Sequence, residues 1–190
     1  MRDSVILEPH TSSRVGKTLS AVAPQLLDRR ANAWLAILRA GLVAGVLDIT
    51  AAIVVYAHVT RTVPMLQGIA SGILGSDAFR GGLVTAGLGL LCHFCIAIAA
   101  AAVYFAASRR LPFLLQHAAV SGAAYGVVAY FFMQLVVIPL SAIGPRPLTL
   151  ATVLVGVTIH IPCVGLPIAL ILRRYAPSNR VADVPRAAET

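Results

Sequence analysis

The chain has 190 residues, of which 58% are hydrophobic and only 12% are charged. Soluble domains carry about 25% charged residues, so this composition excludes an ordinary water-soluble domain, and the mean hydropathy of +0.86 predicts lipid as the solvent. The net charge of +8 would suggest a nucleic-acid partner for a soluble protein. Here the arginines stand at the ends of apolar runs, as in membrane proteins, so we expect the lipid bilayer and no nucleic acid as partner.

Residues 1–32 mix Ser, Thr, Pro and charged residues and predict a cytoplasmic N-terminal arm without the apolar core of a signal peptide. Residues 33–175 are expected to form the transmembrane domain, and residues 176–190 have the composition of a disordered cytoplasmic tail. A helix needs ~20 apolar residues to cross a hydrocarbon layer of ~30 Å. Four runs approach or exceed that length, Ala40–Ala57, Leu83–Ala107, Ala118–Leu140 and Leu148–Leu172, and with their flanks they predict spans at about 36–59, 80–107, 114–141 and 148–173.

The connection after the first span predicts a short amphipathic helix. Pro64 suits the first position of a helix and Gly75 suits its end. Apolar residues between them recur at a spacing of four, which predicts about three turns, too few to cross the membrane. We therefore expect this helix at the outer surface. Ser76 and Asp77 then have the residue types of an N-cap and first turn, and they predict the start of the second span.

The other two connections are short or rigid. Ser108–Pro112 is too short to do more than reverse the chain, and Gly144 to Pro147 predicts a tight turn. The predicted fold class is all-α, an integral membrane four-helix up-down-up-down bundle with one short external amphipathic helix. Three prolines inside spans should kink or locally unwind their helices; they are Pro139, Pro162 and Pro167.

The distribution of basic residues predicts the orientation. Twelve of the 15 lysines and arginines fall on the side that holds both termini, and three fall on the other side. Short loops rich in Lys and Arg stay in the cytoplasm. This predicts a multi-pass protein of the bacterial inner membrane with cytoplasmic N- and C-termini.

Small residues line one face of each span at steps of three and four. Because helices in lipid associate through close packing, we predict helix-packing roles for five glycines, namely Gly41, Gly45, Gly122, Gly126 and Gly156. The sequence leaves open whether the glycines pack within one bundle or between the subunits of a homo-oligomer.

Three ionisable residues share faces with these small residues. A charged Asp in mid-membrane costs ~2.5–3.5 kcal/mol, so Asp48, His93 and His160 should point into the bundle. At ~1.5 Å per residue they lie ~13, ~24 and ~20 Å from the arginines at the cytoplasmic ends of their spans. Gln134 should lie near the outer end of the third span, where it bonds to a neighbouring helix or lines a cavity.

Three functions fit these residues. The first is a non-enzymatic structural or accessory membrane component, in which a buried Asp/His cluster fixes helix register. The second is a small transporter or channel, with the cluster as a proton or ion pathway. The third is a haem- or metal-binding redox protein. In it, His93 and His160 would face each other across a bis-histidine iron, or would join Cys163 and Asp48 around zinc. No metal-binding motif spacing is present, so no metal, cofactor or catalytic residue is assigned.

The remaining cysteines and aromatics have simpler interpretations. Cys92 and Cys95 fall inside a span, where apolar packing is favoured over redox chemistry. Trp34, Tyr56 and Tyr104 lie near span ends, and we expect them at the membrane interface.

Several stretches resemble a widespread group of small, uncharacterised bacterial inner-membrane proteins, and more distantly the YagU-like inner-membrane proteins. The similarity covers roughly residues 38–175. It implies a four-helix inner-membrane protein, with no assigned activity or catalytic residue to carry over. The matching positions are Ala40–Asp48, Leu66–Gly75, His93, Val137–Ala142 and Gly165–Ala169.

Overall fold

A computed structural model describes residues 10–57 and 60–175, and every regular element in these ranges is a helix. The chain divides into two compact units, residues 1–35 and residues 36–190. The described part of the first unit is the N-terminal portion of α1 (His10–Tyr56). Much of the predicted N-terminal arm is therefore helical, while the predicted C-terminal tail lies outside the described residues.

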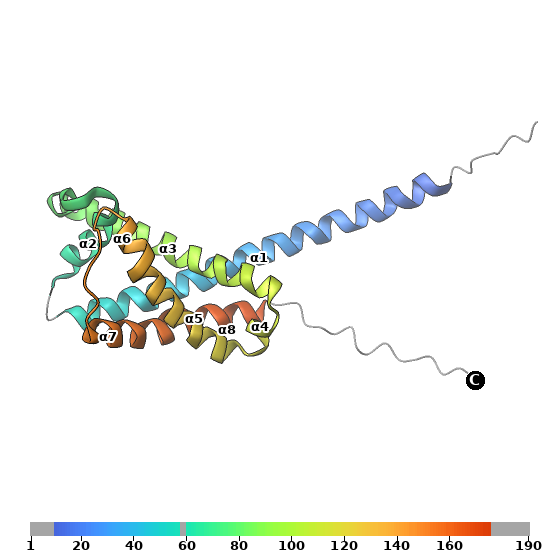
Figure 1. Cartoon of the computed structure of the whole chain (residues 1–190). Coiled ribbons are helices and arrows are strands. Elements are labelled where there is room, and N and C mark those ends of the chain that lie inside the picture. Colours follow the sequence, from blue (N-terminus) through green and yellow to red (C-terminus); the bar gives the residue numbers. More distant parts are fainter. Residues whose placement is uncertain (1–9, 58–59, 176–190) are drawn as a thin grey trace, which may run out of the picture. The chain divides into compact units, whose positions relative to one another are not determined.

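The second unit begins within α1 and contains all the other elements (Figure 1). In chain order these are α2 (Thr62–Leu74), the 3₁₀ helix η1 (Gly75–Arg80), α3 (Gly82–Arg110), α4 (Phe113–Gln116), α5 (Ala118–Phe132), the π-helix η2 (Met133–Val137), α6 (Ile138–Leu140), α7 (Leu150–His160), the π-helix η3 (Ile161–Gly165) and α8 (Leu166–Arg174).

Four helical stretches are long and apolar enough to cross a membrane, and they confirm the predicted all-α four-span fold. They are Ala31–Tyr56, Gly82–Arg110, Ala118–Leu140 and Leu150–Arg174. Large apolar side chains point outward along them; Val84, for example, is 82% exposed. In water such exposure would be costly, whereas in lipid it supplies the surface that acyl chains contact.

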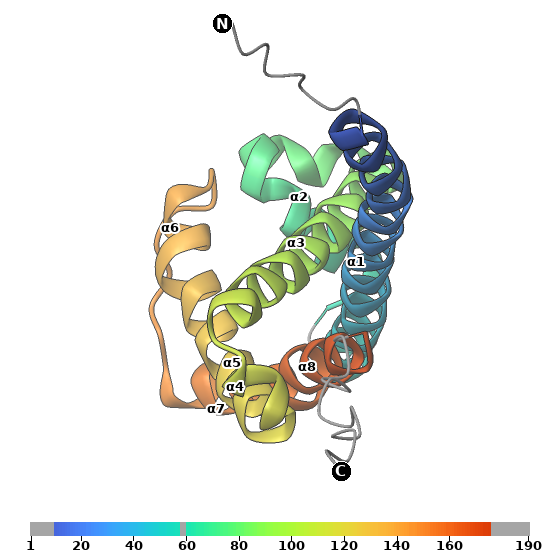
Figure 2. The ribbon, with the colours of Figure 1, turned by 90° about the vertical axis from the view of Figure 1, so that its right-hand side faces the viewer.

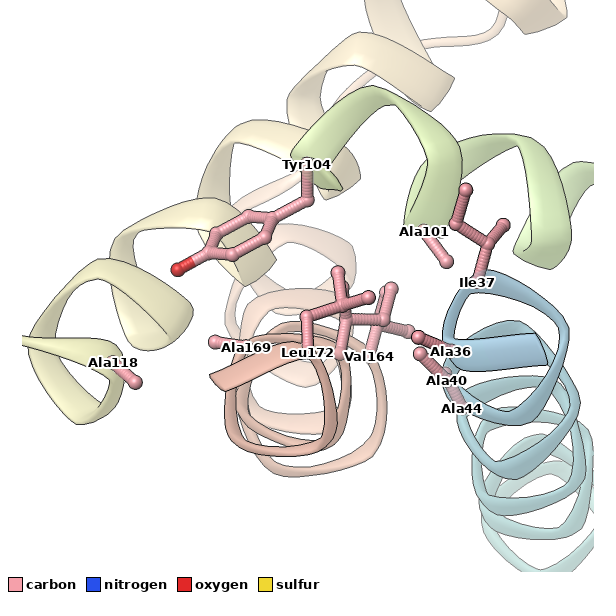
Figure 3. Packing of buried hydrophobic residues seen from close by; sticks show 11 residues of the cluster. Ala36, Ile37, Ala40, Ala44, Ala101, Tyr104, Ala118, Val164, Ala169 and Leu172 are labelled. Carbon is pink, nitrogen blue, oxygen red and sulfur yellow. The ribbon is translucent and has the colours of Figure 1, made fainter. Parts of the chain in front are cut away.

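The core is built mainly from small residues. Ala36, Ala40 and Ala44 of α1 belong to one buried cluster with Ala101 of α3 and Ala169 of α8, and Ala169 lies on the side of α8 that faces α5 (Figure 3). Residues that lack long side chains let helix backbones approach closely, which is the main source of helix association in lipid. Helix α8 also packs against α4 and α5, so the last span lies beside the third (Figure 2).

Glycines lie at the closest contacts between α5 and the last span. A Cβ atom on Gly126 would lie 2.6 Å from the carbonyl oxygen of His160, and one on Gly122 would lie 2.8 Å from Cβ of Ala169. A Cβ on Gly165 would overlap the carbonyl oxygen of Gly122. These two backbones therefore touch, and only glycine fits between them.

The first span packs on the second in the same way. A Cβ on Gly41 would lie 2.6 Å from Cα of Ile98, and one on Gly45 would lie 2.8 Å from the ring of Phe94. On α7, Gly156 faces the ring of Tyr130, which a methyl group there would overlap. All five predicted packing glycines thus contact other helices of their own chain, so a second copy would have to bind a different surface.

The prolines unwind their helices, as predicted. The π-helix η2 lies just before Pro139, and η3 contains Pro162 and ends before Pro167. In each case a backbone N–H bonds five residues back, from Ile138 to Met133 and from Leu166 to Ile161. Proline lacks the N–H of the regular ladder, so the local widening to π geometry leaves fewer carbonyls unsatisfied.

The predicted start of the second span is wrong. Ser76 does not cap α3, because the chain first forms η1, and the N-cap residue of α3 is Gly81. Gly75 and Gly82 both have positive φ angles, +59° and +56°, and they bracket this extra turn. Asp77 pairs instead with Arg80 at 3.4 Å. The glycines at each end, which favour left-handed backbone, separate the two helices.

Helix α2 is present where the amphipathic pattern predicted it, but its packing face is small and polar. Gln67, Ala70 and Ser71 are its buried residues, whereas Ile73 is 66% exposed. A Cβ on Gly89 of α3 would overlap the carbonyl oxygen of Leu66, so the two backbones touch. Ile73 and Leu74 are exposed because contact with lipid costs them nothing, while close approach of two helices needs small residues.

Candidate functional site

His93 links the second span to the first. Its Nε2 atom lies 2.9 Å from the carbonyl oxygen of Gly45 on α1. A carbonyl can only accept a hydrogen bond, so Nε2–H is the donor. The ring of Phe94 packs edge-on against the His93 ring, with centroids 5.6 Å apart. His93 therefore contacts both the Gly45 carbonyl of α1 and the neighbouring Phe94 ring.

His160 ends α7, where the helix widens into η3. Its Nδ1 atom lies 2.9 Å from the carbonyl oxygen of Gly156, one turn earlier in the same helix. By the same reasoning Nδ1–H is the donor. The Tyr130 ring meets the His160 ring edge-on, with centroids 5.4 Å apart. Tyr130 is itself fixed by a 3.0 Å hydrogen bond from its hydroxyl to the carbonyl oxygen of Thr152.

Asp48 and His160 approach each other across the bundle. Asp48 Oδ1 lies 3.9 Å from His160 Nδ1. That distance exceeds the ~3.2 Å limit of a hydrogen bond, and the Nδ1 proton already points to Gly156. The pair is thus an ion-pair contact only when His160 is protonated. The two side chains are 19% and 20% exposed, so they are half-buried and not sealed from their surroundings.

The structure brings the three ionisable residues to neighbouring places without joining them into one set of ligands. His93 bonds to α1 three residues before Asp48, and Asp48 faces His160. Cys163 lies half-buried in η3, and Gln134 lies half-buried in η2. Across residues 10–57 and 60–175, no three His, Cys, Asp or Glu side chains are grouped closely enough to hold a metal ion.

Sequence reasoning missed a polar contact at the start of α3. Gln67 of α2 is 5% exposed, and its Nε2 atom donates to the carbonyl oxygen of Gly82 at 3.0 Å and to Thr85 Oγ1 at 3.2 Å. Thr85 Oγ1 in turn donates to the carbonyl oxygen of Ala78 at 2.6 Å. The available signal was the spacing of Gln67, Ala70 and Ser71, which places them on one helical face.

Tyr104 also differs from its prediction. It was expected at the membrane interface, but it is 1% exposed and lies inside the protein. Its hydroxyl donates to the carbonyl oxygen of Leu114 at 3.0 Å and lies 2.8 Å from Ser121 Oγ. The tyrosine therefore links α3 to α4 and α5. Trp34, in contrast, is 64% exposed and Tyr56 is 37% exposed.

The second and third spans meet through another tyrosine. Tyr125 of α5 donates its hydroxyl proton to the carbonyl oxygen of Ala100 on α3 at 2.7 Å. The rings of Tyr104 and Tyr125 also pack edge-on with centroids 5.0 Å apart. Sequence spacing gave no signal for this contact, because both tyrosines lie in long apolar runs.

Comparison with known proteins gives no family. No protein-family model, no curated protein and no solved structure matches the chain. What can be said of function therefore comes from the membrane-spanning helices and the contacts of their polar residues.

Proposed function

We propose that this multi-pass membrane protein is a non-enzymatic structural or accessory component of the bacterial inner membrane. The observation that carries the proposal is that the two histidines inside spans bond to glycine carbonyls. His93 bonds to Gly45 at 2.9 Å, and His160 bonds to Gly156 at 2.9 Å. Each of these ring N–H groups holds a backbone carbonyl, which is the contact that a structural role requires.

Energetics support a role of His93 in holding helices together. Hydrogen bonds between helices in lipid are worth about 0.6 kcal/mol on average and up to about 1.7 kcal/mol. The His93 bond joins α3 to α1 next to the close contact at Gly45. Because a hydrogen bond is directional, it also fixes the position of α3 along α1, which close packing at Gly45 alone fixes less strictly.

A second candidate function, a proton or ion pathway, is favoured by one observation. Asp48 and His160 lie 3.9 Å apart, and about a fifth of each side chain is exposed. Titratable groups inside a span that are not sealed off are the usual parts of such pathways. Against it, the Nδ1 proton of His160 points to Gly156 and not to the Asp48 carboxylate.

Proton flux into proteoliposomes separates the two functions. The wild-type chain and Asp48→Asn, which keeps the side-chain shape and removes the charge, are reconstituted at equal density and given a pH gradient. The structural role predicts that both match protein-free vesicles. Flux by the wild type that Asp48→Asn abolishes would establish the pathway and overturn the structural role.

We propose further that both termini lie in the cytoplasm. Exposed basic pairs support this orientation, since Arg109 and Arg110 end α3 while Arg173 and Arg174 end α8. Single cysteines in a chain lacking Cys92, Cys95 and Cys163 provide the test. Ser12→Cys and Ser178→Cys should react with a membrane-impermeant maleimide only after the cells are opened, and Ser76→Cys should react in intact cells. Labelling of Ser12→Cys and Ser178→Cys in opposite compartments would refute an even number of spans.

A further inference from the structure

A groove between α1 and α8 lies where basic residues meet the apolar spans. Its volume is about 390 Å³, and it is lined by Arg39, Leu42, Val43, Ile171, Arg174 and Tyr175. This volume falls within the ~300–1,000 Å³ of typical ligand pockets. Arginine and tyrosine form one part of the lining, aliphatic side chains form the rest, and no acidic residue is among them.

Arg39 and Tyr175 fix the level of the groove on the two helices. An Nη1 proton of Arg39 is donated to the hydroxyl of Tyr175, and the guanidinium carbon lies 5.8 Å from the centre of the Tyr175 ring. Tyr175 follows directly after the last residue of α8. Arg39 is therefore level with the end of the last span, as expected of an arginine and a tyrosine at the edge of the hydrocarbon.

The aliphatic residues of the groove lie deeper along the same helices. Leu42 and Val43 come one turn further into α1, and they are 47% and 42% exposed. Ile171 comes one turn before Tyr175 on α8 and is half-buried. A molecule that fills the groove would meet charged donors at one end and apolar surface at the other.

We propose that this groove binds an anionic phospholipid. The headgroup phosphate would lie by the guanidinium groups of Arg39 and Arg174, and an acyl chain would run along Leu42, Val43 and Ile171. Arginine presents planar arrays of N–H donors that suit phosphate oxygens. Arg39 keeps further donors after its bond to Tyr175, because a guanidinium carries five N–H groups. Basic pockets between membrane helices are known to bind such headgroups.

The proposal rests on the spans alone and does not depend on the orientation or the structural role proposed above. Its failure would leave both of those standing, since they are tested by labelling and by flux. The competing explanation is that the two arginines only extend toward the membrane surface. In that case basic residues at the end of α3 would serve the lipid equally well, and this difference can be measured.

Native mass spectrometry of the full chain in a neutral detergent provides the test, with dioleoyl phosphatidylglycerol as the probe. Dioleoyl phosphatidylcholine controls for the acyl chains, and inorganic phosphate controls for the anion. The variant Arg39→Gln/Arg174→Gln is matched by Arg109→Gln/Arg110→Gln, which removes the same charge from the end of α3. A basic residue near a membrane surface contributes about 1 kcal/mol, so the first variant should bind phosphatidylglycerol on the order of thirtyfold more weakly.

The matched variant should bind nearly as tightly as the wild type, and phosphatidylcholine should bind weakly to all three proteins. Val43→Trp should fill the part of the groove assigned to the acyl chain and so weaken the binding of phosphatidylglycerol. The same variant should leave the binding of inorganic phosphate unchanged. Tyr175→Phe should retain binding, because it frees Arg39 without removing its charge. If Arg39→Gln/Arg174→Gln does not fold, Arg174→Gln alone should still weaken binding about fivefold.

Three results would overturn the proposal. Equal losses in the two double variants would mean that the charge acts diffusely. Equal binding of phosphatidylcholine would mean that the headgroup is not selected. Tight binding of inorganic phosphate, with no effect of Val43→Trp on phosphatidylglycerol, would mean that the groove binds the anion and not the lipid.

Discussion

Replacing Gly165 with alanine should separate the third and fourth spans. A Cβ atom at this position would overlap the carbonyl oxygen of Gly122 and lie 2.5 Å from the amide nitrogen of Gly126. Both atoms belong to the backbone of α5, so no side-chain rotation can make room. Helix α5 must move away from η3, or the π-helical segment must change shape.

The size of the effect follows from these contacts. A displacement of about 1 Å already forfeits a quarter to a half of the attraction between contacting atoms. It would also loosen the contacts of Gly122 with Ala169 and of Gly126 with the His160 carbonyl. Overpacking usually costs ~1–3 kcal/mol. We expect Gly165→Ala to lower the free energy of unfolding by about 2–3 kcal/mol. The upper part of the range applies because the overlapping atoms belong to the backbone, which can shift less than a side chain.

Unfolding by sodium dodecyl sulfate in mixed micelles, followed by circular dichroism, measures this free energy. Gly87→Ala is the matched control because nothing lies within 4 Å of its added methyl group. Alanine is favoured over glycine in a helix by ~0.5–1 kcal/mol, so the control should be neutral or more stable. If Gly165→Ala and Gly87→Ala unfold alike, α5 and η3 do not cross at these glycines.

Two further predictions concern polar contacts. His93→Leu removes the N–H that bonds to Gly45 at 2.9 Å, so the same titration should show a free energy of unfolding lower by about 1 kcal/mol. The control His117→Leu, at an exposed position, should change this free energy little. Equal losses in the two variants would mean that the His93 bond does not stabilise the protein. Gln67→Leu removes the two bonds that hold α2 to the start of α3, so the amides of α2 should exchange with deuterium about tenfold faster by mass spectrometry. Unchanged exchange, or the same change in exposed Gln116→Leu, would mean that packing alone holds α2.

The spans and their prolines could be predicted from sequence because each depends on a single segment. The length of the run Leu83–Ala107 against the thickness of the hydrocarbon decides whether it can cross. The missing N–H of Pro139 or Pro162 unwinds a helix whatever lies beside it. Such local causes need no knowledge of the neighbouring helices, so the four spans agree with the predicted ranges to within a few residues at most ends.

Contacts between helices could not be predicted in the same way. Tyr104 near a span end fits an interface residue, yet its hydroxyl finds the Leu114 carbonyl inside the protein. Helix α2 carries an apolar stripe, yet two of its three buried residues, Gln67 and Ser71, are polar and lie outside that stripe. In water the apolar face of a helix would have to be buried. In lipid an apolar face can remain exposed, so the closeness of fit decides which face packs against another helix. Close fit depends on the partner surface, which the pattern of one segment does not contain.

Glycine and histidine in the spans have one physical role in common. A helical glycine has no Cβ to shield its carbonyl, so another helix can approach and a second donor can reach that oxygen. Gly45 is such a position, because it contacts Phe94 and accepts the His93 bond. Gly156 likewise faces Tyr130 and accepts the His160 bond. At Gly45 and Gly156, a glycine predicted for packing therefore also accepts a hydrogen bond from a histidine of the predicted Asp/His cluster.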